Sequence, residues 1–349
     1  MTTRTRYFVF GSLLVLGVGV AAGLVAYSLG YSTIARSSAG GPPELQYVPR
    51  DAAIVAYADV QDVMGSDLRR RLKAALPSSE NGQEEFQART GINVETDIDR
   101  VVAVLARSSG SLEPHDGMVV ASGRFDNTRI ESLMREHGAQ VEEYRNKRVL
   151  VSADAMHRRI EPDGRTPPAA DRANRTFALA FLEPGIIAVG SSTLVRHAVD
   201  LDAGGDNITT NDQVMALVRA LDNGNNAWAL GHFEALRPEA RLPDDIVRQL
   251  PAIDLFSVSA HIDGGVYGTL RAETRDDEAA SNLRDVVRGL LALGRLQAGS
   301  NPEVQAMMQS LELGGSGRTV ALSFSVPAEL FDLMGDYARR RHSPGAPAR

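Results

Sequence analysis

Two histidines on one helix face, or histidines beside cysteines, are the usual sequence signature of a zinc site. The chain has seven histidines and no cysteine. They are His115, His137, His157, His197, His232, His261 and His342. No two lie four residues apart on a predicted helix, so their spacing predicts no zinc site. His232 and His261 fall in predicted strands that can bring them together, but no third ligand is evident, and we interpret them as satisfied or surface side chains.

The segment Asp200–Asp206 begins like a calcium-binding loop, with carboxylates two residues apart and a glycine at the sixth position. It then departs from that pattern, since Gly204 stands where an oxygen ligand is needed and Asn211 replaces the bidentate glutamate. We therefore predict a glycine-rich helix exit here. The glycine-rich segment Gly314–Gly317 precedes a predicted strand rather than a helix, so we predict a turn and no phosphate cradle.

Signatures of nucleophilic catalysis are also missing from the sequence. There is no G-x-S-x-G elbow, no S-x-x-K and no cysteine nucleophile. We accordingly predict no catalytic, cofactor-binding or metal-binding residues, and a protein that is not an enzyme.

The composition narrows the class of partner. The chain of 349 residues has a net charge of −7, 43% hydrophobic residues and 5% aromatic residues. This size and apolar content suit a folded body with one large core or two ordinary domains. The acidic balance argues against nucleic acid, because phosphate binding needs a concentrated basic face.

The stretch Tyr7–Leu29 is the main apolar segment of the N-terminal region. No charged side chain occurs between Arg6 and Arg36. As a helix it is roughly 35 Å long, enough to cross a hydrocarbon core of ~30 Å. We predict that residues 1–31 form a cytoplasmic N-terminus and a transmembrane helix. Arg4 and Arg6 precede the run, and this bias favours an N-terminus inside and a body outside the cytoplasmic membrane, in the periplasm or beyond the cell.

Two alternatives accompany this anchor. A cleaved signal peptide competes with a retained span, since Ala26–Ser28 resembles a small-x-small cleavage site, although the apolar run is longer than a usual signal-peptide core. Gly19 and Gly23 have the spacing that lets two membrane helices approach closely, although small residues are frequent in such helices anyway. The absence of cysteine excludes a lipid anchor on that residue.

A tether rich in Ser, Ala, Gly and Pro is predicted over 32–44, and a first α+β unit over 45–225. Its predicted strands are Ala52–Ala58, Arg100–Ala106, Gly117–Arg124, Arg148–Ser152, Phe177–Leu182 and Ile186–Gly190. Its predicted helices are Val63–Leu76, Asn127–His137, capped by Asp126 or Asn127, and Ser192–Leu201.

From Asn226 the order of elements restarts, which predicts a second, diverged copy of the unit over 226–338 and a disordered tail over 339–349. The copy is predicted to contain Ala227–Phe233, Asp244–Leu250, Ile253–Ala260, Gly265–Glu273, Asp276–Leu296, Ser310–Leu313, Arg318–Val326 and Ala328–Tyr337. Ile253-Asp254 corresponds to Ile98-Asp99. In the long helix the apolar residues Leu283, Val286, Val287, Leu290, Leu291 and Leu296 are predicted to form one stripe.

Hairpins interleaved with helices predict an α+β fold with antiparallel sheets covered by helices. Alternation along the strands is incomplete. Either the sheets are buried on both faces, or the two units pack their sheets face to face.

The opening segment Leu45–Asp59, with its Pro-x-Asp-Ala turn at Pro49, an apolar strand and Asp59, resembles a class of uncharacterised bacterial exported proteins. In those proteins the same pattern follows a single N-terminal span. The resemblance implies a bacterial, envelope-located protein and brings no site residues with it.

These observations predict a non-enzymatic single-pass membrane protein, anchored in the bilayer through Tyr7–Leu29, whose exported domain binds a partner protein or supports an envelope complex. The alternative is a membrane-anchored ligand-binding protein or hydrolase with a site between the two units. A ligand-sized apolar cleft with convergent polar groups would favour the alternative, and an exposed apolar patch would favour the first prediction.

Overall fold

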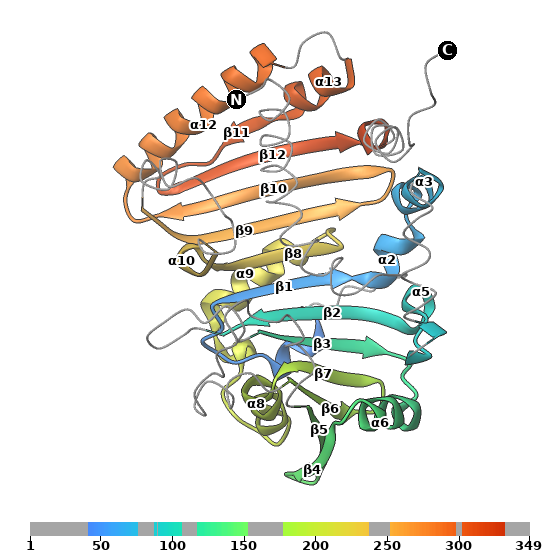
Figure 1. Cartoon of the computed structure of the whole chain (residues 1–349). Coiled ribbons are helices and arrows are strands. Elements are labelled where there is room, and N and C mark those ends of the chain that lie inside the picture. Colours follow the sequence, from blue (N-terminus) through green and yellow to red (C-terminus); the bar gives the residue numbers. More distant parts are fainter. Residues whose placement is uncertain are drawn as a thin grey trace, which may run out of the picture.

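One antiparallel sheet of twelve strands runs through the part of the chain that the structure describes (Figure 1). This computed structural model describes residues 41–75, 87–88, 90–106, 117–152, 177–236, 252–297 and 302–331. In their order across the sheet, the strands are β11 (Glu312–Gly314), β12 (Thr319–Pro327), β10 (Gly265–Thr274), β9 (Ile253–Ile262), β8 (Ala227–His232), β1 (Ile54–Asp59), β2 (Ile98–Leu105), β3 (Gly117–Gly123), β7 (Ile186–Ser191), β6 (Phe177–Glu183), β5 (Lys147–Ser152) and β4 (Gln140–Tyr144). The fold class is therefore α+β, as the sequence predicts.

Helices and short helical turns connect the strands. They are η1 (Pro43–Tyr47), α2 (Val60–Gly65), α3 (Asp67–Ala75), α5 (Val94–Asp97), α6 (Asn127–Glu136), α8 (Ser192–Asp202), η3 (Ile208–Thr210), α9 (Asp212–Asp222), α10 (Phe233–Leu236), α12 (Asp277–Gln297) and α13 (Pro302–Ser310). Several begin at side-chain caps. The Asp126 carboxylate accepts a hydrogen bond from the Arg129 backbone N–H at 3.0 Å, which confirms the predicted start of α6.

The sheet has two halves that meet at its centre, where β1 pairs with β8. The first half contains β1 to β7 and the second half contains β8 to β12. Tyr57 on β1 lies opposite Trp228 on β8, and their rings stack with centroids 5.4 Å apart. The halves are thus joined edge to edge, and do not pack face to face.

Strands follow the same order in both halves. In the first half β1, β2 and β3 form a meander, a helix follows, and a later hairpin returns β7 to the side of β3. In the second half β8, β9 and β10 form the meander, and β12 returns to the side of β10. The first half has one further hairpin, β4–β5, at the outer edge.

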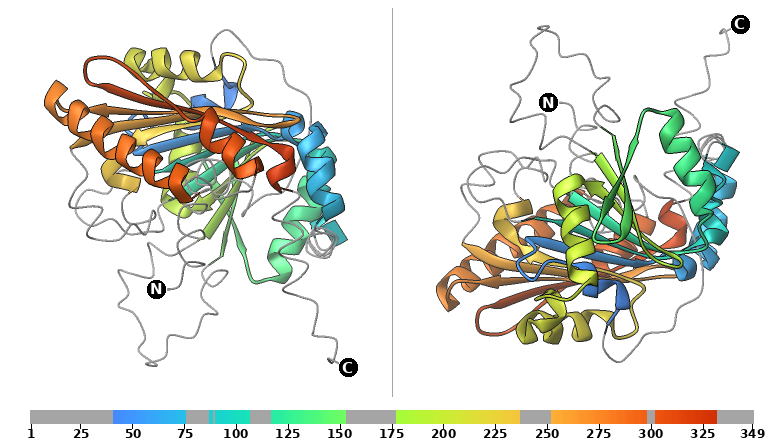
Figure 2. Two further views of the ribbon diagram at one scale, coloured as in Figure 1. Left: turned by 90° about the horizontal axis from the view of Figure 1, so that it is seen from above. Right: turned by 90° about the horizontal axis from the view of Figure 1, so that it is seen from below.

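Helices cover the two faces of the sheet unequally. We call the two faces the Trp228 face and the Ala56 face, after these central residues. On the Trp228 face, η1, α8, η3 and α9 cover the first half and reach β8. On the Ala56 face, α6 lies over the first half, and α12 and α13 lie over the second. Figure 2 shows α9 and α12 on opposite sides of the sheet.

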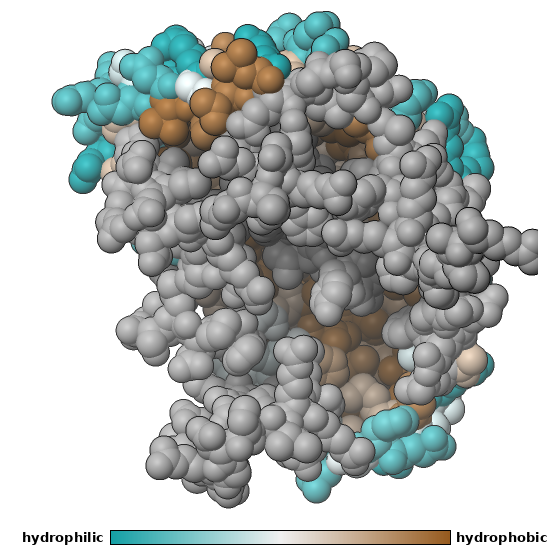
Figure 3. Space-filling model, turned by 45° about the horizontal axis from the view of Figure 1, so that its top comes forward, coloured by the Kyte–Doolittle hydropathy of each residue, from teal (hydrophilic) through white to brown (hydrophobic). Residues whose placement is uncertain are grey.

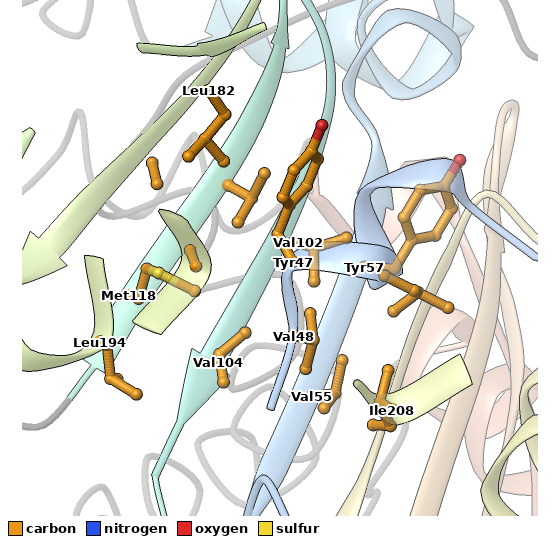
Figure 4. Close-up of a cluster of buried hydrophobic side chains, with 14 of the residues drawn as sticks. Tyr47, Val48, Val55, Tyr57, Val102, Val104, Met118, Leu182, Leu194 and Ile208 are labelled. Carbon is orange, nitrogen blue, oxygen red and sulfur yellow. The ribbon is translucent and has the colours of Figure 1, made fainter. Parts of the chain in front are cut away.

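The largest core cluster lies beneath the helices of the Trp228 face. Figure 4 shows part of it, with Tyr47 and Val48 from the N-terminal segment resting on side chains of β1, β2 and β3. All six residues of β1 are buried. A strand buried on both faces requires an almost continuous apolar run, and Ile54–Ala58 provides it.

Some sequence-based boundaries were wrong. The predicted helix Val63–Leu76 is broken at Ser66, whose backbone is extended at ψ 150°, so α2 and α3 are separate helices. The strand β4 and the helices α9 and α13 were not predicted. Glu44, at the end of the expected tether, belongs to η1 and is fully buried.

The predicted span Tyr7–Leu29, with Gly19 and Gly23, lies outside the described residues, and so does the tail 339–349. Within the described ranges, every helix is either too short or too polar to cross a membrane.

Candidate functional site

A cavity of about 310 Å³ lies where the two halves meet at one end of the sheet. The alternative prediction, a ligand-binding or hydrolytic site between the two units, would place its site here. Its lining comes from the α2–α3 region and from the end of β9, and consists of Gln61, Asp62, Gly65, Ser66, His261, Ile262 and Asp263. Serine, histidine and aspartate are the residue types of a hydrolytic triad.

The hydroxyl of Ser66 is engaged in local backbone structure. It donates to the Val63 carbonyl at 2.5 Å and accepts a hydrogen bond from the Arg69 backbone N–H at 3.1 Å, so it caps the start of α3. A nucleophilic serine needs its proton directed to a base such as histidine. The arrangement at Ser66 therefore fits a helix cap and not a catalytic nucleophile.

Asn226 connects the halves beside this cavity. The side chain is 2% exposed. Its amide nitrogen donates to an Asp62 carboxylate oxygen at 2.6 Å and to the Ile262 carbonyl at 2.8 Å, and its oxygen accepts from the Ile262 N–H at 2.9 Å. A buried amide that satisfies both its donors and its acceptor in this way stabilises one arrangement of the two halves.

The two strand histidines lie apart. Register pairs His232 with Leu255 near the start of β9, whereas His261 is near the end of β9. At ~3.3 Å per residue along a strand, the two positions are roughly 20 Å apart. Among the described residues no group of three or more metal-ligating side chains comes together.

A buried ionic cluster occupies the centre of the first half. The Glu44 carboxylate, fully buried, accepts a hydrogen bond from Arg100 Nε at 2.9 Å, and its second oxygen has no partner among the described residues. Nearby, Asp59 caps α2 by accepting the Asp62 N–H at 2.8 Å. Burial raises the pKa of the Asp59 carboxyl, while that cap hydrogen bond opposes the shift.

Tyr57 adjoins this cluster, with its hydroxyl 3.4 Å from an Asp59 carboxylate oxygen. Burial raises the pKa of the Tyr57 phenol, and the negative charge of Asp59 adds to the shift. Perturbed pKa values mark functional candidates only where a cleft admits a ligand. These groups are interior, and the Glu44–Arg100 pair ties the helix η1 to β2.

A second, wider groove of about 430 Å³ runs between α6 and the β4–β5 hairpin. Its lining is mainly polar and consists of Asn127, Thr128, Glu131, Ser132, Arg135, Asn146, Lys147, Arg148 and Phe181. Glu131 is nearly buried and pairs with Arg135 at 2.8 Å and with Arg148. The charged groups of the groove therefore neutralise one another in part.

The calcium-like segment is a helix exit, as predicted. Helix α8 ends at Asp202, and Gly204 follows with φ 114°, a conformation that favours glycine. Asp200 accepts hydrogen bonds from the Tyr144 hydroxyl at 3.1 Å, and Asp202 pairs with Lys147 at 2.7 Å. The carboxylates are used to hold α8 against β4 and β5. Gly314–Gly317 likewise lies at the turn between β11 and β12.

The Trp228 face of β9, β10 and β12 carries mainly polar side chains. We call it the open face. Its central residues, paired across the three strands, are Ser257, Ser259, His261, Tyr267, Thr269, Arg271, Ala321, Ser323 and Ser325. The helices α12 and α13 pack on the other side of these strands. Of the described helices, α9 and α10 contact β9, the strand of the open face nearest the first half, and Ser257 on it is buried. Tyr267 and Arg271, on the next strand β10, are exposed.

Tyr267 stands out on the open face because 51% of it is exposed. Arg271 lies four residues on, on the same face, and is also exposed. Between them, Thr269 and Ser323 share a hydrogen bond at 3.2 Å across the strands. Tyrosine and arginine are side chains enriched at the centres of protein interfaces.

A row of leucines is exposed on α12, formed by Leu290, Leu293 and Leu296. We call it the leucine row. Figure 3 shows apolar side chains gathered beside polar ones at the end of the molecule where α12 lies. The predicted apolar stripe is right in part: Leu283, Val287 and Leu291 pack inward, whereas Leu290 and Leu296 are exposed.

The class that this fold defines is an α+β protein built on one broad antiparallel sheet. No protein-family model matches the chain, and no curated protein matches it. A solved structure titled "Structure of crystal form I of TP0453" is similar with a TM-score of 0.43 and 10% sequence identity, over 84% of this chain and 97% of that one.

Sequence reasoning did not single out Tyr267 or Arg271. The available signal was the alternation in β10, where Tyr267, Thr269 and Arg271 occupy every second position. An aromatic and a basic residue on the polar side of this strand were the features that sequence reasoning could have singled out.

Proposed function

We propose that this chain is a non-enzymatic single-pass protein of the cytoplasmic membrane. Its N-terminus lies inside, Tyr7–Leu29 crosses the bilayer, and its body outside the membrane binds a partner protein or supports an envelope complex. The anchor is supported by the length of the uncharged run. The binding role is supported by the open face, and above all by the exposure of Tyr267.

The alternative, a ligand-binding protein or hydrolase, has less support. The cavity between the halves is about 310 Å³, at the small end of ligand sites, which span ~300–1,000 Å³. Its serine is a helix cap and its buried amide joins the halves. These contacts favour a structural role for the region.

We also propose that the body consists of two diverged copies of one unit. The equal order of strands in the two halves supports this. Register supports it as well, since Ile54 pairs with Leu105 and Ala227 pairs with Ala260. If β1 is superposed on β8 with Ile54 at Ala227, then Ile98 falls on Ile253, the correspondence expected from the two Ile-Asp pairs.

Partner binding is tested by comparing what co-purifies with the full chain and with its variants from mild detergent. The double variant Tyr267→Ala, Arg271→Ala should lose a specific partner that the native chain retains. Gln140→Ala, on the exposed edge strand β4, is the matched control and should retain it. An unchanged set of co-purifying proteins in the double variant would overturn the assignment of the open face.

The topology is tested with protease added to intact spheroplasts. Digestion of the body, with a small membrane-protected fragment left behind, is the expected result. Full protection of the body would overturn the orientation. Release of the body into the soluble fraction without protease would show that the span is cleaved.

A further inference from the structure

The groove between α6 and the β4–β5 hairpin carries two arginines that come from different elements. Arg135 lies near the end of α6, and Arg148 lies on β5. Both donate to the same carboxylate oxygen of Glu131, Arg135 at 2.8 Å. Glu131 is nearly buried, whereas the side chains of Arg135 and Arg148 are 56% and 60% exposed. One buried carboxylate therefore holds two guanidinium groups together, with a large part of each side chain open to solvent.

The charged side chains that face the groove have a positive balance. Lys147 belongs to the lining, but its ammonium group pairs with Asp202 and donates to the Leu182 carbonyl on the Trp228 face. Two positive charges and one negative charge then remain. Glu143, opposite Arg148 on β4, does not line the groove and makes no ion pair within the described ranges. The groove is thus a locally positive surface on a chain with a net charge of −7.

Uncharged polar side chains form most of the remaining lining. Asn127 and Thr128 begin α6 and Asn146 lies in the hairpin turn, and none of these three side chains has a hydrogen-bond partner in the described part of the chain. Ser132 donates to the Thr128 carbonyl at 2.9 Å, and Phe181 adds a half-buried aromatic ring. The volume of about 430 Å³ falls within the ~300–1,000 Å³ of small-molecule sites. This lining suits a polar anion with hydrogen-bonding groups.

The hairpin turn puts a side chain into the groove where the backbone would favour glycine. Tyr144 pairs with Lys147, so the turn has two central residues, Arg145 and Asn146, with φ 47° and 61°. They are the two non-glycine residues with positive φ in the described ranges. A turn with positive φ at both positions prefers glycine at the second, and asparagine tolerates this conformation. Glycine at 146 would give the groove no side chain, whereas Asn146 lines it.

We propose that this groove binds a small phosphate ester that also carries hydroxyl groups. Arginine binds phosphate oxygens through parallel N–H groups, and two arginines held by one carboxylate can reach different oxygens of one phosphate. A phosphate monoester has a charge of about −1.5 to −2 at pH 7, so it is attracted more strongly than a carboxylate. The free amides and the Thr128 hydroxyl bind the ester's own hydroxyl groups. The groove is on the first half of the sheet, so it is separate from the open face.

The test titrates the full chain in mild detergent with glucose 6-phosphate, and separately with glucose and with inorganic phosphate, by calorimetry. Glucose 6-phosphate should bind at least ~10-fold more tightly than either of the other two probes, because it engages both the arginines and the uncharged groups. Arg135→Gln should weaken its binding at least ~10-fold. Arg288→Gln is the matched control, since Arg288 is an exposed arginine that pairs with Asp285 on its own helix, outside the groove, and it should leave the affinity unchanged.

Two further variants separate ligand binding from a structural role. Asn146→Gly should weaken binding at least ~3-fold without lowering the thermal midpoint, because glycine suits the turn. Glu131→Gln should strengthen binding at least ~3-fold, because it removes a negative charge beside the phosphate while the amide oxygen still accepts from the arginines. A carboxylate that only joined α6 to β5 would give no such gain.

Three results would overturn the proposal. The first is that glucose 6-phosphate does not bind, or binds no more tightly than inorganic phosphate. The second is an equal loss of affinity in Arg288→Gln and Arg135→Gln, which would show that the anion binds to exposed arginines in general. The third is an affinity that fails to rise in Glu131→Gln, which would place the phosphate away from the two arginines.

Discussion

The two halves of the sheet share an order of strands but differ in what covers them. In the first half, helices lie on both faces, and all six residues of β1 are buried. In the second half, α12 and α13 lie on the Ala56 face, and the opposite face carries serine, threonine and an exposed tyrosine. The same topology thus serves as a closed core on one side of the molecule and as a presented surface on the other.

Side-chain chemistry along the strands accounts for this difference. Strand β3 places Met118 and Val120 on one face and Val119 and Ala121 on the other, so both faces need cover. Strand β10 instead alternates between polar and apolar side chains. Thr269 and Arg271 point to one face of the sheet, and Leu270 points to the other. Alternation of this kind lets one face of an antiparallel sheet remain in contact with water. The difference predicts that substitutions in the core cost stability and that those on the open face cost binding.

The largest expected difference in stability between the closed core and the open face comes from removing one buried and one exposed aromatic side chain. Trp228 is fully buried, stacks on Tyr57, and donates its indole N–H to the Asp222 carboxylate at 3.1 Å. Trp228→Ala leaves a cavity and a buried acceptor without its donor. We expect a loss of about 4 kcal/mol in the free energy of unfolding, measured by urea denaturation.

Tyr267→Ala is the matched control for Trp228→Ala. Because the side chain is half exposed, its removal should change the free energy of unfolding by less than about 1 kcal/mol. Similar losses in the two variants would contradict the division into a closed core and an open face.

Much of the strand and helix content follows from the sequence alone. Ile54–Ala58 is an apolar run long enough for a buried strand, and Asp126 is a good cap at the start of α6. Glu183–Gly185 marks the turn between β6 and β7, where Gly185 adopts φ 80°. In each case the signal is local, because the residues that decide the structure are neighbours along the chain.

Other features depend on contacts that are distant in sequence. The pairing of β1 with β8 joins residues such as Ala56 and Ala229, and no pattern within either strand specifies the other as its partner. Strand β4 was missed because Glu142 and Glu143 disfavour a strand, yet an exposed edge tolerates and even uses such charges. Tyr267 is exposed because α12 packs on the opposite face of β10. The sequence of β10 does not specify which face that helix covers.

A buried ion pair in the first half and an exposed arginine in the second half give a second comparison, with a smaller expected loss of stability. Arg100→Met removes the partner of the fully buried Glu44 carboxylate. Breaking a buried pair typically costs ~3–5 kcal/mol, and since the Arg100 side chain is 30% exposed we expect a loss of about 2–3 kcal/mol. Arg271→Met on the open face is the matched control and should stay within about 0.5 kcal/mol. Equal effects in urea denaturation would show that the Glu44 pair does not stabilise the first half.

The smallest expected effect is a change in pH dependence at the last residue of α9. Burial raises the pKa of the Asp222 carboxyl, and the hydrogen bond from Trp228 opposes this shift. A raised pKa means that the folded state holds the proton more tightly than the unfolded chain. This carboxyl therefore lowers stability as pH rises from its ordinary pKa of 3.8 through the raised value.

Asp222→Asn removes that titration while an amide oxygen remains to accept the Trp228 N–H. The stability of the variant relative to the native chain should therefore increase with pH across this window and level off above it. Urea denaturation of both proteins at a series of pH values measures the difference. A difference that stays flat, or falls as pH rises, would mean that Asp222 is not held in a low-dielectric core, and that the closed part of the molecule is more open at α9 than its burial indicates.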